Sequence, residues 1–168
     1  LAIVTTLSFS TNAKSEETLN TQFKTAYYSY QGAVKSNDVD EQFKYAKEAY
    51  QLGKKLYGDT NVNTANLALI LAQQHINKNQ NKQAMPLLLN TLNIFKSEYG
   101  KNAIELAEIY ILLGQSIPYN KRNKSIDYYL EAIDIAEDHE KEQPYFNAQI
   151  QLEAGIALLR QGSRKSNT

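Results

Sequence analysis

The segments KLYG, residues 55–58, and SEYG, residues 97–100, end two apolar runs with the same Tyr-Gly pair, and the pair returns after 42 positions. A fixed spacing of this length is a signature of repeat proteins, in which each repeat forms one supersecondary unit. The two stretches that begin at these pairs are therefore candidate repeats.

The two stretches align along most of their length, with one residue deleted in the second loop of the later one. Apolar or small residues fall opposite one another on both sides of that deletion. The aligned pairs are Ala65 with Ala107, Leu71 with Leu113, Ala72 with Gly114, Leu89 with Leu130, Leu92 with Ile133 and Ile94 with Ile135. This agreement predicts that the fold is built from repeated units.

The local pattern predicts an all-α protein. After Lys14, apolar residues recur at intervals of three and four, whereas long alternating patterns typical of strands are missing. Gly58 and Gly100 are placed to end helices, and Asp38 or Asp40 is placed to cap the start of one. The predicted helices cover about residues 17–35, 40–56, 61–76, 82–98, 102–116, 123–140 and 144–161.

The aligned helix pairs resemble the tetratricopeptide repeat, whose pattern places Leu-Gly in the first helix and Ala, an aromatic residue or Leu, and Ala in the second. One copy is matched by Leu71, Ala72, Ala84, Leu88 and Thr91, the next by Leu113, Gly114, Ser125, Tyr129 and Ala132, and partial copies by Gln42, Ala46 and Ala49 and by Gly155, Leu158 and Gly162. The 42-residue period is similar to the longer kinesin-light-chain-type variant of this family.

The resemblance implies antiparallel helix pairs stacked as a right-handed α-solenoid over residues 14–162, followed by a frayed tail at 163–168. Small residues at Ala72, Gly114 and Gly155 would let paired helices approach closely. The glycine of each Tyr-Gly pair would take the left-handed helix cap, and the tyrosine would pack back on the preceding helix. The last unit lacks a second helix, so either the final helix caps the array or the sequence stops early.

In this family the first helices of successive pairs line a concave surface, which implies an extended peptide or a partner helix bound there. Side-chain amides on such a surface can both donate to and accept from a peptide backbone. The predicted partner-binding residues are Lys24, Tyr27, Gln31, Asn66, Leu69, Gln73, Asn77, Glu108, Ile111, Gln115, Tyr119 and Gln149. The alternative is that these residues are simply the exposed polar positions of the helices.

The first residues resemble the end of a secretory signal. An apolar run at 1–9 passes through small residues to Ala13, and charges begin at Lys14. Cleavage after Ala13 is predicted, with export of the mature chain, which in a Gram-negative cell means the periplasm. A buried strand or the tail of a membrane anchor is the alternative, and the run is too short to span a bilayer as it stands.

Composition excludes several classes of function. The 168 residues contain no cysteine and have a formal net charge of zero, so neither a thiolate site nor a broad nucleic-acid footprint is expected. Neither a glycine-rich phosphate loop nor a hydrolase motif is present, so we expect no enzyme and no cofactor. His75 is expected to pack within its helix, and His139 to lie at a solvated helix end. A weak metal site from Asp134, Asp138 and His139 is the less favoured alternative.

Twelve tyrosines are present, and two clusters of them are candidate binding surfaces: AYYSY at 26–30 and DYYLEA at 127–132. Adjacent residues of a helix point to different sides, so at least one tyrosine of each adjacent pair is expected in the core.

Two functions from different classes follow. The first is a non-catalytic, exported scaffold that binds a protein or peptide along the concave face. The second is a spacer or oligomerisation region of a larger protein, such as the repeat-bearing type of TonB-like energy transducer, which this sequence resembles only faintly. Exposed apolar residues at the incomplete last unit would favour self-association.

Overall fold

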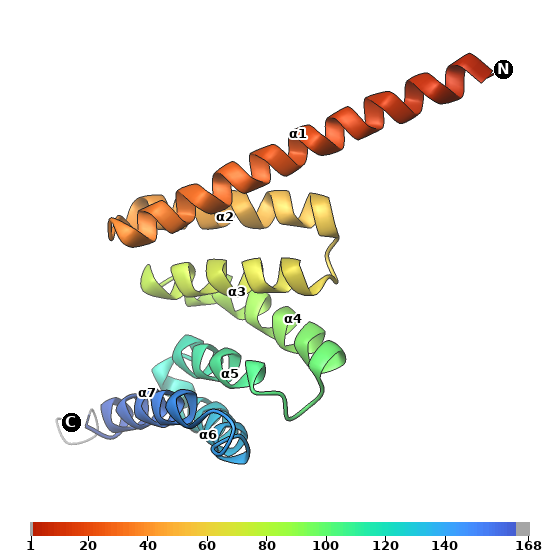
Figure 1. Ribbon diagram of the computed structural model, residues 1–168. Helices are drawn as coiled ribbons and strands as arrows, with labels where there is room; N and C mark the ends of the chain where they lie inside the picture. Colours follow the sequence, from red (N-terminus) through yellow and green to blue (C-terminus); the bar gives the residue numbers. More distant parts are fainter. Residues whose placement is uncertain (1, 164–168) are drawn as a thin grey trace. The chain divides into compact units, whose positions relative to one another are not determined.

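A computed structural model describes the backbone of residues 2–163 and the side chains of residues 15–160, apart from that of Tyr119. Within these residues the chain is all-α, as predicted, and contains no strand (Figure 1). The helices are α1 (Ala2–Lys35), α2 (Val39–Tyr57), α3 (Val62–Asn77), α4 (Asn81–Tyr99), α5 (Glu105–Ser116), α6 (Arg122–Asp138) and α7 (Pro144–Ser163), with a short 3₁₀ helix, η1 (Tyr119–Lys121), before α6.

The predicted boundaries are confirmed to within about three residues, apart from the start of α1. That helix begins at Ala2 rather than near residue 17. No glycine or proline precedes Gly32, so no residue in this stretch opposes helix formation strongly. The predicted cleavage after Ala13 falls outside the described side chains and stays a prediction. Of the predicted tail 163–168, only Ser163, the last residue of α7, is described.

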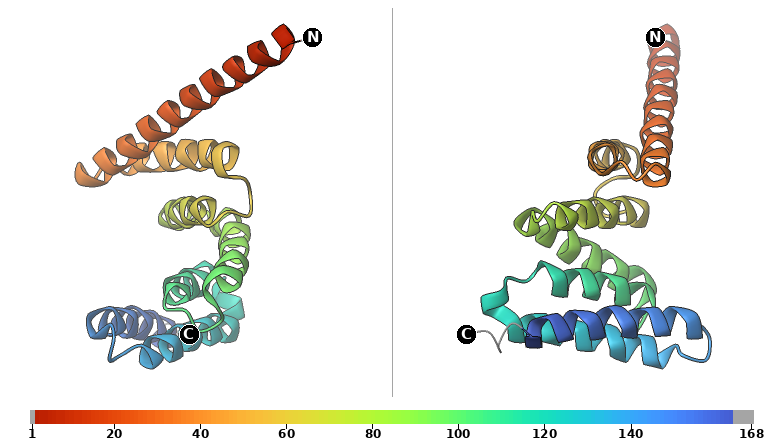
Figure 2. Two further views of the ribbon diagram at one scale, coloured as in Figure 1. Left: turned by 45° about the vertical axis from the view of Figure 1, so that its right-hand side comes forward. Right: turned by 90° about the vertical axis from the view of Figure 1, so that its left-hand side faces the viewer.

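The chain divides into two compact units, Leu1–Gln74 and His75–Thr168. The first unit contains α1, α2 and most of α3. The second contains the end of α3, η1 and helices α4 to α7 (Figure 2). The predicted domain at 14–162 therefore spans both units.

In the first unit, α1 and α2 pack against each other as a pair joined by a three-residue turn. Asp38 starts α2 as predicted, because its carboxylate accepts a hydrogen bond from the Glu41 backbone N–H at 3.0 Å. The core of this unit consists of Ala26, Ala49, Leu52 and Leu67, with Leu19, Phe23, Tyr27 and Tyr50 packed against it.

In the second unit, α5 is the most enclosed helix. It contacts α4, α6 and α7, and nine of its 12 residues are buried. All members of the two complete motif copies named above are buried as well. The motif residues of both copies are therefore core residues, whereas the aligned residues Leu89 and Leu130 are exposed, 41% and 47%, and do not belong to the core.

The 42-residue period returns in the backbone at both Tyr-Gly pairs. Gly58 and Gly100 end α2 and α4 with φ of 85° and 96°, and their N–H groups donate to the carbonyl oxygens of Lys54 and Lys96. Their ψ angles of 167° and 171° place them in an extended, positive-φ region rather than the left-handed helical one. The prediction of a glycine cap was thus right in the sign of φ and wrong in ψ, because the chain leaves each helix extended.

A second backbone feature repeats at the same spacing. Asn37 and Asn79, 42 positions apart, have φ of 56° and 58°, and each lies in the turn between two consecutive helices. Asparagine tolerates this left-handed conformation better than most residues. The turn before α6 differs, because Pro118 and η1 occupy that region instead.

Both tyrosines of the Tyr-Gly pairs make edge-on aromatic contacts. The Tyr99 ring packs on Phe95 of its own helix at 5.3 Å between centroids, as predicted. The Tyr57 ring packs instead on Phe23 of α1 at 5.7 Å.

The three small residues that were expected to allow close helix approach are not equally surrounded by other side chains. Ala72 is fully buried, and a Cβ at Gly114 would lie only 2.5 to 2.9 Å from ring atoms of Tyr129 on α6. A Cβ at Gly155 would meet nothing within 4 Å, so the prediction was wrong there. The packed face of α7 instead presents Ile150 and Ala154.

Candidate functional site

The exposed face of α5 is narrow and polar. Of its 12 residues only Glu105, Glu108 and Gln115 are exposed. Two of these, Glu108 and Gln115, were predicted to contact a partner. Ile111, which lies between them and was predicted with them, is 1% exposed. Its side chain belongs to the core, because α5 is covered by α4, α6 and α7 on its other sides.

Helix α7 places two more polar groups beside this face. Exposed Gln149 donates from its side-chain amide to the Glu153 carboxylate one turn later, at 3.2 Å. Burial of the carboxyl group, and then the nearby charge of Glu153, raise the pKa of Glu108. Glu108 also keeps exposed surface, so water screens part of this effect. We name Glu108, Gln115, Gln149 and Glu153 the α5–α7 polar face.

The α5–α7 polar face can bind two kinds of group. The amides of Gln115 and Gln149 can donate to and accept from a peptide backbone. The two carboxylates repel each other, so a cationic Lys or Arg side chain between them would relieve that repulsion.

The predicted partner-binding residues on α1 differ in their exposure. Lys24 and Gln31 are exposed. Tyr27 is half-buried, stacks on Phe23 at 6.0 Å between centroids, and packs against the core of the first unit. Tyr27 therefore has a packing role whether or not it also contacts a partner.

The predicted residues on α3 fall on both sides of the boundary between the units. Asn66 and Asn77 are exposed, whereas Leu69 and Gln73 are partly buried. The Asn66 amide donates to the Val62 carbonyl of its own helix at 3.0 Å. The side chain of Tyr119 lies outside the described side chains.

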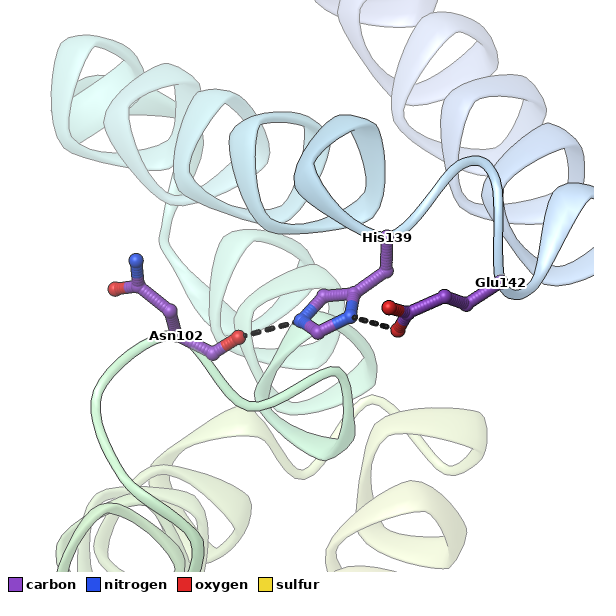
Figure 3. Close-up of polar contacts among 3 residues, drawn as sticks. All are labelled: Asn102, His139 and Glu142. Atoms are coloured by element: carbon purple, nitrogen blue, oxygen red, sulfur yellow. Dashed lines mark hydrogen bonds and ion pairs between the residues drawn. The ribbon is translucent and has the colours of Figure 1, made fainter.

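His139 lies at a helix end, as predicted, but makes contacts that the sequence did not predict. It follows α6, and its Nε2 lies 2.8 Å from the Asn102 carbonyl oxygen in the loop before α5 (Figure 3). Its Nδ1 lies 3.3 Å from a Glu142 carboxylate oxygen. Both partners are acceptors, so both contacts are hydrogen bonds only when the imidazole carries two protons.

The hydrogen bond to Asn102, and then that to Glu142, raise the pKa of His139 above its usual 6.5. Because its pKa is raised in the folded state, protonated His139 stabilises the folded chain. This stabilisation is complete below the pKa of the unfolded chain and is lost as the pH rises through the pKa of the folded chain. The wild-type chain should therefore be more stable, relative to His139→Gln, at pH values below 6.5 than at alkaline pH, and this difference should be lost as the pH rises above 6.5. Urea unfolding of both proteins at several pH values measures this difference.

The NMR titration of His139 provides an independent check. The chain has two histidines, so the His139→Gln variant assigns the two imidazole signals. A His139 pKa at or below 6.5 would show that the link between Asn102 and Glu142 does not hold in solution.

The other sequence candidates can be placed as well. His75 is partly buried, and its Nδ1 lies 2.7 Å from the Gln80 side-chain oxygen in the following turn. No group of three metal-ligating side chains of the His, Cys, Asp or Glu type lies together among the described residues. Within the same residues, no helix is sufficiently long and apolar to cross a membrane.

The two tyrosine clusters each contribute to the core, as expected from their adjacent residues. Tyr129 is buried against Gly114, whereas Tyr28 is exposed. Tyr30 is partly buried and interacts with the buried side chain of Gln74. Burial raises the pKa of Tyr30, and the hydrogen bond from Gln74 opposes that shift. Gln74 carries no signal in the sequence that distinguishes it from the exposed glutamines.

Neither a protein-family model nor a curated protein nor a solved structure matches this chain. The resemblance to the tetratricopeptide repeat therefore remains a prediction from the motif residues.

Proposed function

We propose that this chain is a non-catalytic scaffold that binds a protein or peptide through the polar faces of its helices. The observation that supports it best concerns α5. This helix is enclosed everywhere except where Glu105, Glu108 and Gln115 reach the surface. A helix that is covered on its other sides gives these side chains a rigid base, which lowers the entropic cost of binding.

The partner that fits the α5–α7 polar face is an extended or helical segment carrying Lys or Arg. Gln115 and Gln149 would bind its backbone amides, and Glu108 with Glu153 its cationic side chain. In the stacked-repeat arrangement that the sequence motif implies, Lys24, Gln31, Asn66 and Gln73 would add contacts of the same kind.

Selection of binders from a random peptide library, with the full chain as bait, tests the proposal. Affinity for a selected peptide should fall at least tenfold in the Glu108→Ala, Gln115→Ala double variant, which corresponds to about 1.4 kcal/mol. Gln83→Ala is the matched control, because Gln83 is exposed on α4 outside the predicted set. Selected peptides that bind the double variant as tightly as wild type would contradict the proposal.

Export of the mature chain is part of the same proposal. It rests on the apolar start and the small residues that precede Lys14. The N-terminal sequence of the natural protein would begin at Lys14 if cleavage follows Ala13.

The second candidate, a spacer or oligomerisation region of a larger protein, is favoured by one observation. Large apolar side chains are exposed on the last helix of the second unit.

A further inference from the structure

Helix α7 carries apolar residues on two opposite faces. One face presents Ile150 and Ala154, which are buried together with the polar Asn147 where α7 contacts α5 and α6. The opposite face presents Tyr145, Leu152, Ile156 and Leu159, which are 85, 63, 40 and 74% exposed. We name these four residues the outer stripe.

The outer stripe is continuous along the helix. Its members are separated by seven, four and three positions, spacings that return to the same side of an α-helix. From Tyr145 to Leu159 it extends roughly 21 Å at about 1.5 Å per residue. A continuous apolar surface of this kind on a small unit is typical of an interaction site.

The outer stripe is self-complementary about its centre. Tyr145 and Leu159 lie seven positions to either side of Leu152, and Ala148 and Ile156 lie four positions to either side. In an antiparallel pair of α7 helices with Leu152 facing its counterpart, Tyr145 would therefore face Leu159, and large Ile156 would face small Ala148. This pairing of large with small residues is what close helix packing requires.

Charges at the two ends of the helix fit the same arrangement. The turn before α7 contains exposed Glu140, Lys141 and Glu142, which together carry one net negative charge, and exposed Arg160 lies in the last described turn of the helix. An antiparallel pair would bring the basic end of each α7 toward the acidic turn of the other. Such rim charges mainly set the orientation of an interface.

We propose that the outer stripe is a homodimer interface, in which α7 packs antiparallel on α7 of a second copy about a two-fold axis at Leu152. An isologous contact of this kind buries the same surface on both copies, so it forms a closed dimer and does not extend to further copies. The proposal does not depend on the peptide-binding function, because Glu108 and Gln115 lie on α5. The other two members of the α5–α7 polar face, Gln149 and Glu153, lie on α7 beside the outer stripe.

Light scattering and sedimentation of the full chain over a range of concentrations test the dimer. The expected mass rises toward twice the monomer mass, whereas Leu152→Glu stays monomeric because two carboxylates would face each other at the axis. Leu130→Glu is the matched control, since Leu130 is 47% exposed on α6 outside the outer stripe. A wild-type monomer at every concentration, or a dimer that Leu152→Glu leaves intact, would overturn the proposal.

Cysteine cross-linking tests the register, and the chain has no cysteine of its own. Under mild oxidation, Leu152→Cys should form a covalent dimer in high yield, because residues at the axis lie within disulfide reach. Tyr145→Cys and Leu159→Cys should cross-link to each other when mixed, and only weakly with themselves. Self-linking of Tyr145→Cys in high yield would show a parallel or shifted contact and overturn the antiparallel assignment.

Discussion

Replacing Ile111 with alanine is expected to lower the free energy of unfolding by about 2–4 kcal/mol. The Ile111 side chain is 1% exposed on a helix that contacts α4, α6 and α7. Truncation removes buried methyl and methylene groups and leaves a cavity that the surrounding helices fill only in part. Urea unfolding followed by circular dichroism measures the change.

The control for Ile111 lies on the same helix. Gln115→Ala removes an exposed side chain four positions later and should change stability by no more than about 0.5 kcal/mol. If Ile111→Ala left stability unchanged and weakened peptide binding instead, Ile111 would be a partner contact, as its place in the motif first indicated.

Replacing Gly114 with alanine is expected to destabilise the second unit by about 1–3 kcal/mol. The added methyl group would lie 2.5 to 2.9 Å from three ring atoms of Tyr129, which is itself buried. The buried hydroxyl of Ser125 also donates to the Gly114 carbonyl oxygen at 2.7 Å. Moving α5 away from α6 to relieve the clash would stretch that hydrogen bond, so the cost cannot be avoided by a small shift.

Gly155→Ala distinguishes the clash at Gly114 from the general effect of removing a glycine. Gly155 also lies inside a helix of the second unit, and a Cβ there would meet nothing within 4 Å. Alanine at this position should raise stability by about 0.5–1 kcal/mol, because glycine disfavours the helix. Equal effects of the two substitutions, measured by thermal unfolding, would contradict the close approach of α5 and α6 at Gly114.

The buried and the exposed residues of α5 have different roles. Ile111 and Gly114 pack against neighbouring helices, whereas Glu108 and Gln115 reach the surface. Variants of the second pair can therefore test partner binding without loss of the fold.

The sequence by itself determined the helices and the positions of two glycines that end helices. Intervals of three and four between apolar residues predicted all seven helices, and the Tyr-Gly spacing predicted the glycines with positive φ at Gly58 and Gly100. These features are local: a helix depends on the periodicity of its own residues, and a cap on the few residues around it. The motif comparison also identified buried positions such as Leu113 and Ser125.

Only the tertiary structure decided which faces of the helices are covered. Ile111 and Leu152 are both aliphatic residues on helices, yet one is buried and the other exposed. Within the described residues, α5 contacts α4, α6 and α7, whereas α7 contacts α5 and α6 and leaves Leu152 uncovered. His139 likewise acquires its role from Asn102, which lies 37 positions away in the sequence. Burial and long-range hydrogen bonds depend on which other helices lie alongside, and that information is absent from the periodicity of a single segment.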